Sequence, residues 1–201
     1  NYTTPPTVVF TGAQGNVVVA AGNNAATYTA TYTVQAGDAE GVLAFTVTST
    51  DAAGNVSTNT ATMDNSNVTI DTDVPALSSV SIASNGTGGI LAKATNEVTL
   101  TFTANEAIGT PTVTFTSGGD AANNADVVAG GANNTYTAKY TVAQDDTDGP
   151  VGFTIGFSDT AGNAGTAVTD VTDSSGVTID TTVPVINAIA TIAFDWGAVL
   201  N

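Results

Sequence analysis

The stretch from Tyr136 to Pro184 decides the fold of this chain. It opens with the segment Tyr136-Thr-Ala-Lys-Tyr-Thr-Val142 and continues through Val151-Gly-Phe-Thr-Ile-Gly-Phe157. The turn Asp159-Thr-Ala-Gly-Asn163 follows, and the stretch closes with Val177-Thr-Ile-Asp-Thr-Thr-Val-Pro184. In the first two segments every second residue is apolar or aromatic, which predicts β-strands with one buried face.

The same series occurs earlier in the chain. Tyr28-Thr-Ala-Thr-Tyr-Thr-Val34 matches the first segment with one change, and Asp51-Ala-Ala-Gly-Asn55 matches the turn. The closing segment has its match in Val68-Thr-Ile-Asp-Thr-Asp-Val-Pro75. The spacing between the matched segments is nearly constant, so the chain contains a tandem repeat of about 100 residues, the length of an Ig-like domain.

The repeat predicts an all-β chain of tandem Ig-like antiparallel β-sandwiches with about seven strands in each repeat. We place an N-terminally incomplete repeat at residues 1–75 and a complete repeat at residues 76–184. Residues 185–201 are then the start of a third unit or an exchanged strand. Pro75 and Pro184 mark the joints, because proline stiffens a connector and ends a strand ladder.

The clearest strand of the complete repeat is Glu97-Val-Thr-Leu-Thr-Phe-Thr-Ala104, in which the apolar residues fall on one face. The first copy has no counterpart of residues 77–105. Two explanations stay open at this point. The 201 residues are cut from a longer array, or the gap is filled by strands from a neighbouring molecule.

The charge balance excludes several classes of function. The chain has 18 acidic residues and two lysines, for a net charge of −16. This argues against nucleic acid, whose phosphates need basic side chains, and against an anionic membrane surface. There is no apolar run long enough for membrane insertion. With no histidine and no cysteine, a Ser-His-Asp or Cys-His arrangement is impossible within this chain, and we expect no enzyme.

The turn and closing motifs together resemble the bacterial Ig-like repeats of large prokaryotic surface proteins, such as biofilm adhesins and S-layer proteins. The matching stretches are Asp51–Asn55 with Val68–Pro75, and Asp159–Asn163 with Val177–Pro184. The segment Phe194–Asn201 is similar to the start of related repeats. The resemblance covers nearly the whole chain.

The resemblance implies a structural protein outside the cell or at its surface: an adhesin stalk, an S-layer subunit or a filament subunit. Its partners would be neighbouring repeats and, by strand exchange, identical subunits. The alternative is a carbohydrate-binding module of an adhesin or secreted hydrolase, with a surface glycan as partner. Exposed aromatic rings would favour that alternative. Four tyrosines instead fall in phase with core positions: Tyr28, Tyr32, Tyr136 and Tyr140.

Members of this family hold calcium at domain joints, so the resemblance also implies calcium as a cofactor. Calcium takes six to eight oxygen ligands from carboxylates, carbonyls and amides. The chain offers such oxygens close to the joints and in the turns. The candidate ligands are Asp71, Asp73, Asn105, Glu106, Asp180, Asp51 and Asp159.

Several acidic positions of the chain have competing interpretations. Asp51 and Asp159 also fit a plain turn, in which the carboxylate caps backbone N–H groups and the glycine takes a positive φ. Thr182 stands where the first copy has Asp73, which weakens the case for a matching site at the second joint. The acidic segment Asp145–Asp148 is best interpreted as a solvated turn.

Overall fold

The computed structural model describes residues 4–22, 27–122, 126–128 and 132–188. Nearly all of its regular structure is strand, which confirms the predicted all-β class, and the sheets are sandwich-like. The chain separates into two compact units. Unit 1 comprises Asn1–Ala76, Glu106–Gly109 and Ser158–Gly165, and unit 2 comprises Leu77–Asn105, Thr110–Phe157 and Thr166–Asn201.

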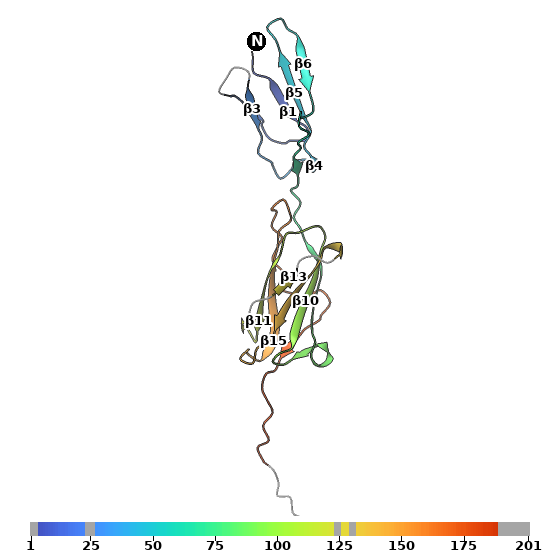
Figure 1. Ribbon diagram of the computed structural model, residues 1–201, viewed down its shortest axis with the longest axis vertical. Helices are drawn as coiled ribbons and strands as arrows, with labels where there is room; N and C mark the ends of the chain where they lie inside the picture. Colours follow the sequence, from blue (N-terminus) through green and yellow to red (C-terminus); the bar gives the residue numbers. More distant parts are fainter. Residues whose placement is uncertain (1–3, 23–26, 123–125, 129–131, 189–201) are drawn as a thin grey trace, which may run out of the picture. The chain divides into compact units, whose positions relative to one another are not determined.

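Unit 1 contains one three-stranded sheet and two strand pairs, all antiparallel (Figure 1). The sheet has the order β1-β5-β6, and the pairs are β2-β3 and β4-β7. The strands are β1 (Thr7–Phe10), β2 (Val18–Ala21), β3 (Tyr28–Thr31), β4 (Gly41–Val42), β5 (Phe45–Thr50), β6 (Val56–Asn59) and β7 (Thr69–Ile70).

Unit 2 contains a four-stranded and a five-stranded sheet. The first has the order β13-β14-β10-β8 and the second β12-β11-β15-β16-β9. The strands are β8 (Leu77–Ser84), β9 (Leu91–Ala92), β10 (Glu97–Ala104), β11 (Thr112–Ser117), β12 (Asp120–Ala121), β13 (Asp126–Val128), β14 (Thr135–Thr141), β15 (Gly149–Gly156) and β16 (Thr178–Ile179). All pairs are antiparallel except β16 with β9. Short 3-10 turns lie at Thr87–Gly89 and Ala132–Asn134.

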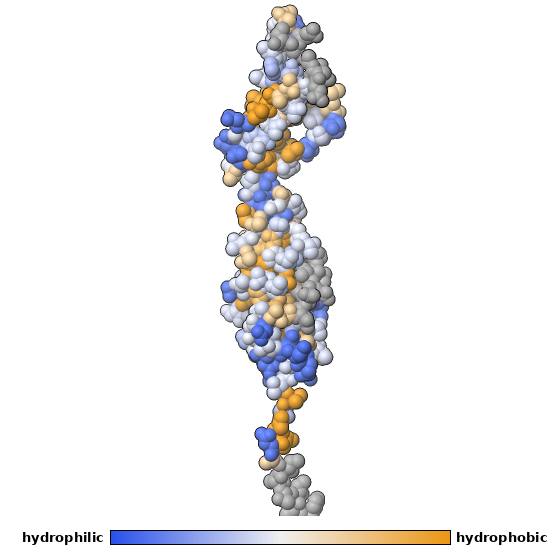
Figure 2. Space-filling view, turned by 90° about the vertical axis from the view of Figure 1, so that its left-hand side faces the viewer, coloured by the Kyte–Doolittle hydropathy of each residue, from blue (hydrophilic) through white to orange (hydrophobic). Residues whose placement is uncertain are grey.

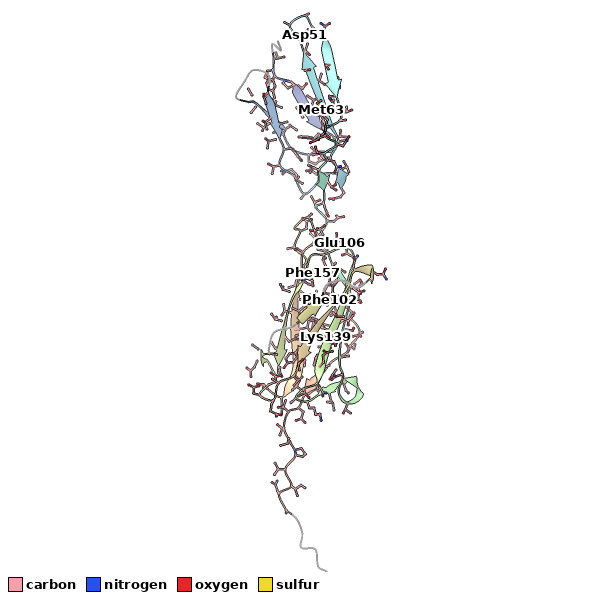
Figure 3. The ribbon with its side chains drawn as sticks, viewed as in Figure 1. Asp51, Met63, Phe102, Glu106, Lys139 and Phe157 are labelled. Carbon is pink, nitrogen blue, oxygen red and sulfur yellow. The ribbon has the colours of Figure 1, made fainter. Side chains whose placement is uncertain are left out.

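The core of unit 2 follows the predicted alternation. Val98, Leu100 and Phe102 on β10 are fully buried. Phe102, which is labelled in Figure 3, lies on β10. It is opposite Tyr136 of β14, and the two rings stack with centroids 5.7 Å apart. The threonines between the apolar residues face outward and are half-buried. Burial of one face of β10 thus fixes the register of this sheet, since a slip of one residue would expose the whole apolar set.

Unit 1 buries its apolar side chains less completely. Phe10 of β1 lies opposite Phe45 of β5 and contacts the ring of Tyr32 at a centroid distance of 5.9 Å, yet all three side chains are half-exposed. Val9 and Val18 are 59% and 62% exposed. Figure 2 shows hydrophobic side chains, in orange, reaching the surface.

Candidate functional site

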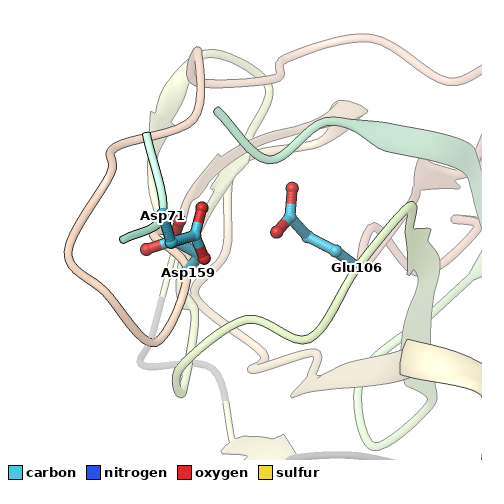
Figure 4. Close-up of side chains that lie close together, drawn as sticks. All are labelled: Asp71, Glu106 and Asp159. Carbon is cyan, nitrogen blue, oxygen red and sulfur yellow. The ribbon is translucent and has the colours of Figure 1, made fainter. Parts of the chain in front are cut away.

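Three carboxylates from distant parts of the sequence meet in unit 1. They belong to Asp71, which follows β7, to Glu106, which follows β10, and to Asp159, which follows β15. One carboxylate oxygen from each lies within 4.8 Å of the others. Figure 4 shows the Glu106 side chain extending towards the two aspartates. We call this group the acidic cluster.

The carboxylate of Asp159 is hydrogen-bonded within its own turn. Its Oδ1 accepts hydrogen bonds from the N–H of Gly162 at 2.6 Å and of Asn163 at 2.8 Å, and its Oδ2 accepts one from Asn163 Nδ2 at 2.7 Å. Gly162 has a φ of +105°, a conformation that side chains disfavour. Burial to 4% exposure acts to raise the pKa of Asp159, but these hydrogen bonds outweigh it and lower the pKa below its usual value.

The turn also fastens the segment that contains Asp71. Asn163 Nδ2 donates to the backbone oxygen of Asp71 at 3.0 Å. The Asp71 carboxylate accepts a hydrogen bond from the N–H of Asp73 at 3.3 Å. One amide side chain therefore bridges the capped turn and the segment before Pro75, which is buried.

Glu106 reaches the acidic cluster from a loop that is tied to the same turn. The N–H of Gly109 donates a hydrogen bond to the backbone oxygen of Ser158 at 2.9 Å, and Ile108 forms an isolated antiparallel β-bridge with Asp159. Burial, together with the negative charges of Asp71 and Asp159, raises the pKa of the Glu106 carboxyl above its usual value. A nearby positive charge would stabilise the ionised form of this carboxyl group and lower its pKa again.

The chemistry of the acidic cluster suits a hard divalent cation. It offers only oxygen ligands, and backbone carbonyls and water can complete the six to eight positions of calcium. The chain has no arginine, and Lys139 forms an ion pair with Glu97 at 2.9 Å. A metal ion would supply the positive charge that the sequence itself scarcely contains.

The remaining candidate ligands lie in other places. Asp73 and Asn105 are exposed neighbours of the acidic cluster in the sequence, and the charge of Asp73 contributes to the raised pKa of Glu106. Asp180 is exposed, and its carboxylate accepts a hydrogen bond from the N–H of Thr182 at 3.0 Å.

Asp51, which is labelled in Figure 3, lies in a turn with a pattern of hydrogen bonds similar to that of Asp159. Its carboxylate accepts hydrogen bonds from Asn55 Nδ2, from the N–H of Asn55 and from the N–H of Ala53, at 2.9, 2.8 and 2.9 Å. The bonds from Asn55 lower the pKa of Asp51. Within the residues that the structure describes, the acidic group that could hold a metal does not include Asp51, Asp73 or Asp180.

Glu40 is a residue that the sequence reasoning missed. Its carboxylate accepts hydrogen bonds from the hydroxyl and, at 2.9 Å, from the N–H of Thr72, next to Asp71. In unit 2 Asp148 does the same for Thr181, whose N–H donates to it at 2.6 Å. The signal was present in the repeat: an acidic residue precedes the glycine at both Gly41 and Gly149.

The acidic segment Asp145–Asp148 is more than a solvated turn. Asp146 accepts hydrogen bonds from the Tyr140 hydroxyl and, at 2.6 Å, from the N–H of Ala143. Asp148 also accepts a hydrogen bond from the hydroxyl of Thr182 at 2.6 Å. Two of the three carboxylates of this segment therefore have structural partners.

The aromatic residues favour the core interpretation over a sugar-stacking platform. Tyr136 and Tyr140 are 6% and 1% exposed, and Tyr140 stacks with Phe115 at a centroid distance of 5.6 Å. Tyr28 at the start of β3 and Tyr32 just after its end are half-exposed.

In comparisons with known proteins, no family model and no curated protein matches this chain. Among the described residues, no helix is both long and apolar enough to cross a membrane. The sequence repeat and the acidic cluster are therefore the features of this chain that bear on its function.

Proposed function

We propose that the protein is a structural component outside the cell, a tandem Ig-like spacer or assembly subunit of the kind found in adhesin stalks, S-layers or filaments. A divalent cation, calcium in the first place, binds at Asp71, Glu106 and Asp159 and stiffens the chain at the segment before Pro75. The observation that supports this proposal is the meeting of three carboxylates from three separated segments.

The proposed cation would act as a clasp, that is, it would bind ligands from three segments of the chain and hold these segments together. Asp71 belongs to the linker, whereas Glu106 and Asp159 come from loops that are hydrogen-bonded to each other. Glu40 and Asn163 already hold the linker at Thr72 and Asp71. A cation would add bonds to all three segments at once and relieve their mutual repulsion.

The composition supports a mechanical role. A chain with a net charge of −16 repels itself, and cations in the surrounding medium reduce that repulsion. Candidates for catalysis are few, because the chain lacks histidine and cysteine. Among the described residues of unit 2, Tyr136 and Tyr140 are buried in the core, so their rings are not exposed to a sugar.

The experiment is a comparison of the full chain with excess calcium and with a chelator. We expect calcium to raise the melting temperature and to lengthen the particle in small-angle X-ray scattering, because a stiff linker extends the chain. The control variant Asp145→Asn removes one exposed charge outside the acidic cluster and should keep both responses. The proposal fails if chelation changes neither the melting temperature nor the length.

A further inference from the structure

Strand β3 of unit 1 has a free edge in the part of the chain that the structure describes. It pairs with β2 on one side, where Ala30 lies opposite Val19. The matching strand β14 of unit 2 is paired on both sides, with β13 and with β10. A strand with one unpaired row of N–H and C=O groups is a template for a further strand.

The apolar face next to this edge is open as well. Tyr28, Ala30 and Phe45 are half-exposed. Their matches Tyr136, Ala138 and Phe153 are buried, at 6%, 0% and 8% exposure. The same residue types in the same repeat positions are thus covered in unit 2 and uncovered in unit 1.

A cavity of about 270 Å³ lies over this face. Its lining is apolar almost throughout, and it comes from β1 and β5 of the three-stranded sheet and from the pair β2-β3. The lining includes Val8, Phe10, Tyr28, Ala30, Phe45 and Val47. An open apolar cavity beside an unpaired strand edge fits an added strand better than a small polar ligand.

Unit 2 shows which chemistry fills the equivalent place. There β10 pairs with β14 so that Leu100 lies opposite Ala138 and Phe102 opposite Tyr136. Both apolar side chains are fully buried. The occupant of unit 1 therefore needs large apolar residues two positions apart, aligned with Ala30 and Tyr28.

We propose that the free edge of β3 binds the segment Val185–Asn201 of a second copy of this chain, a strand exchange that specifies the proposed structural role and rests on it. From Ile186 to Trp196 every second residue of this segment is apolar. Ile192 and Phe194 repeat the spacing of Leu100 and Phe102 in β10. In the exchanged pair Ile192 lies opposite Ala30, and Phe194 lies opposite Tyr28.

The length, exposure and charge of this segment agree with such a role. Residues 189–201 lie outside the described residues. A fully extended chain with as many residues as this part spans about 40 Å. The described residues Val185 and Ile186, which precede that part, are 74% and 79% exposed. The segment contains one charged residue, Asp195, in a chain of net charge −16, so it can approach another copy with little repulsion.

The test is sedimentation velocity of the full chain over a range of concentrations, together with hydrogen exchange at the β3 amides. We expect oligomers that grow with concentration and protection of β3 that grows with them. The double variant Ile192→Asp with Phe194→Asp should remain monomeric, with β3 exchange faster by about tenfold or more. Thr191→Asp with Ala193→Asp places the same charges on the other face of the strand and should assemble as the unchanged chain does.

A synthetic peptide of residues 185–201, added to the Ile192→Asp and Phe194→Asp variant, should restore the protection of β3. A monomer at all concentrations, with equal β3 exchange in all variants, would overturn the proposal. Protection that does not depend on concentration, or protection by residues preceding position 1 in a longer protein, would overturn it too. None of these variants changes the acidic cluster, so calcium binding at Asp71, Glu106 and Asp159 can fail or succeed independently.

Discussion

The hydroxyl of Tyr32 donates a hydrogen bond of 2.6 Å to the carboxylate of Asp38, six residues later in unit 1. Asp38 is buried and also accepts hydrogen bonds from the N–H of Gln35 at 2.7 Å and of Gln14 at 2.8 Å. In unit 2 Tyr140 and Asp146 form the same pair. In both units a tyrosine thus donates a hydrogen bond to an aspartate six residues later in the chain.

The first prediction concerns this link. Tyr140→Phe should lower the free energy of unfolding by about 1–2 kcal/mol, because it leaves a part-buried carboxylate with one partner fewer. Urea unfolding measures the change. Asp145→Asn, which removes the neighbouring exposed carboxylate, should have little effect. Equal losses in the two variants would show that the link does not stabilise unit 2.

A second prediction concerns pH. The pKa of Asp159 is lowered in the folded state, so its contribution to stability is present above the unfolded pKa of about 3.9 and is lost as the pH falls through the folded pKa. Asp159→Asn should therefore be less stable than the unchanged chain at neutral pH and should lose less on acidification. Thermal unfolding between about pH 2 and pH 6 in chelator measures this. Parallel pH profiles of the two proteins would contradict it.

A third prediction has the opposite sign. The pKa of Glu106 is raised in the folded state. The contribution of Glu106 to stability is therefore fully present below its unfolded pKa of about 4.3 and is lost as the pH rises through the folded pKa. In chelator at neutral pH, Glu106→Gln should raise the melting temperature, because it removes a repelling charge. With calcium present the same variant should gain less stability than the unchanged chain. A variant that is destabilised in chelator would rule out repulsion within the acidic cluster.

Much of the architecture could be predicted from residue pattern alone. The strict alternation of Glu97–Ala104 identifies both the strand β10 and its buried face, since only one register buries Val98, Leu100 and Phe102 together. The two-residue strands β9 and β12 are too short to leave a period in the sequence. The positions of β9 and β12 are set by the strands with which they pair in the folded sheet.

Only some of the residues of the candidate site could be predicted from the sequence. Asp71 was predicted from its place before Pro75, and Glu106 from its place after the strand Glu97–Ala104. The structure brings these two together with Asp159. Which turn of the repeat meets the linker depends on packing, so sequence position could not separate Asp159 from Asp51. Glu40 was missed because a single acidic residue before a glycine resembles an ordinary turn.

A fourth prediction tests the linker anchors. Asp148→Ala should speed hydrogen exchange at the N–H of Thr181, because this N–H donates to Asp148 at 2.6 Å. The hydrogen bonds from Thr181 and Thr182 lower the pKa of Asp148, so protonation of this carboxyl in acid should have the same effect in the unchanged chain. Asp170→Asn, at an exposed position elsewhere in unit 2, serves as the control. Unchanged exchange at Thr181 would show that Asp148 does not hold this segment.

A fifth prediction uses the matched phenylalanines of the two units. Phe153→Ala should cost about 3–5 kcal/mol, the range for truncating a buried aromatic side chain. Phe45→Ala should cost less in the monomer, because Phe45 is half-exposed and Phe153 is 8% exposed. Equal costs, measured by denaturant unfolding at low protein concentration, would indicate that the apolar face of unit 1 is already covered in the monomer.

Isothermal titration of calcium into the full chain and into its Glu106→Gln variant, with Asp145→Asn as the matched control, measures whether the acidic cluster binds a cation. We expect a binding event in the unchanged chain and in Asp145→Asn, and its loss or a large weakening in Glu106→Gln. Absence of calcium binding, or binding that is the same in all three proteins, would contradict a cation clasp at Asp71, Glu106 and Asp159.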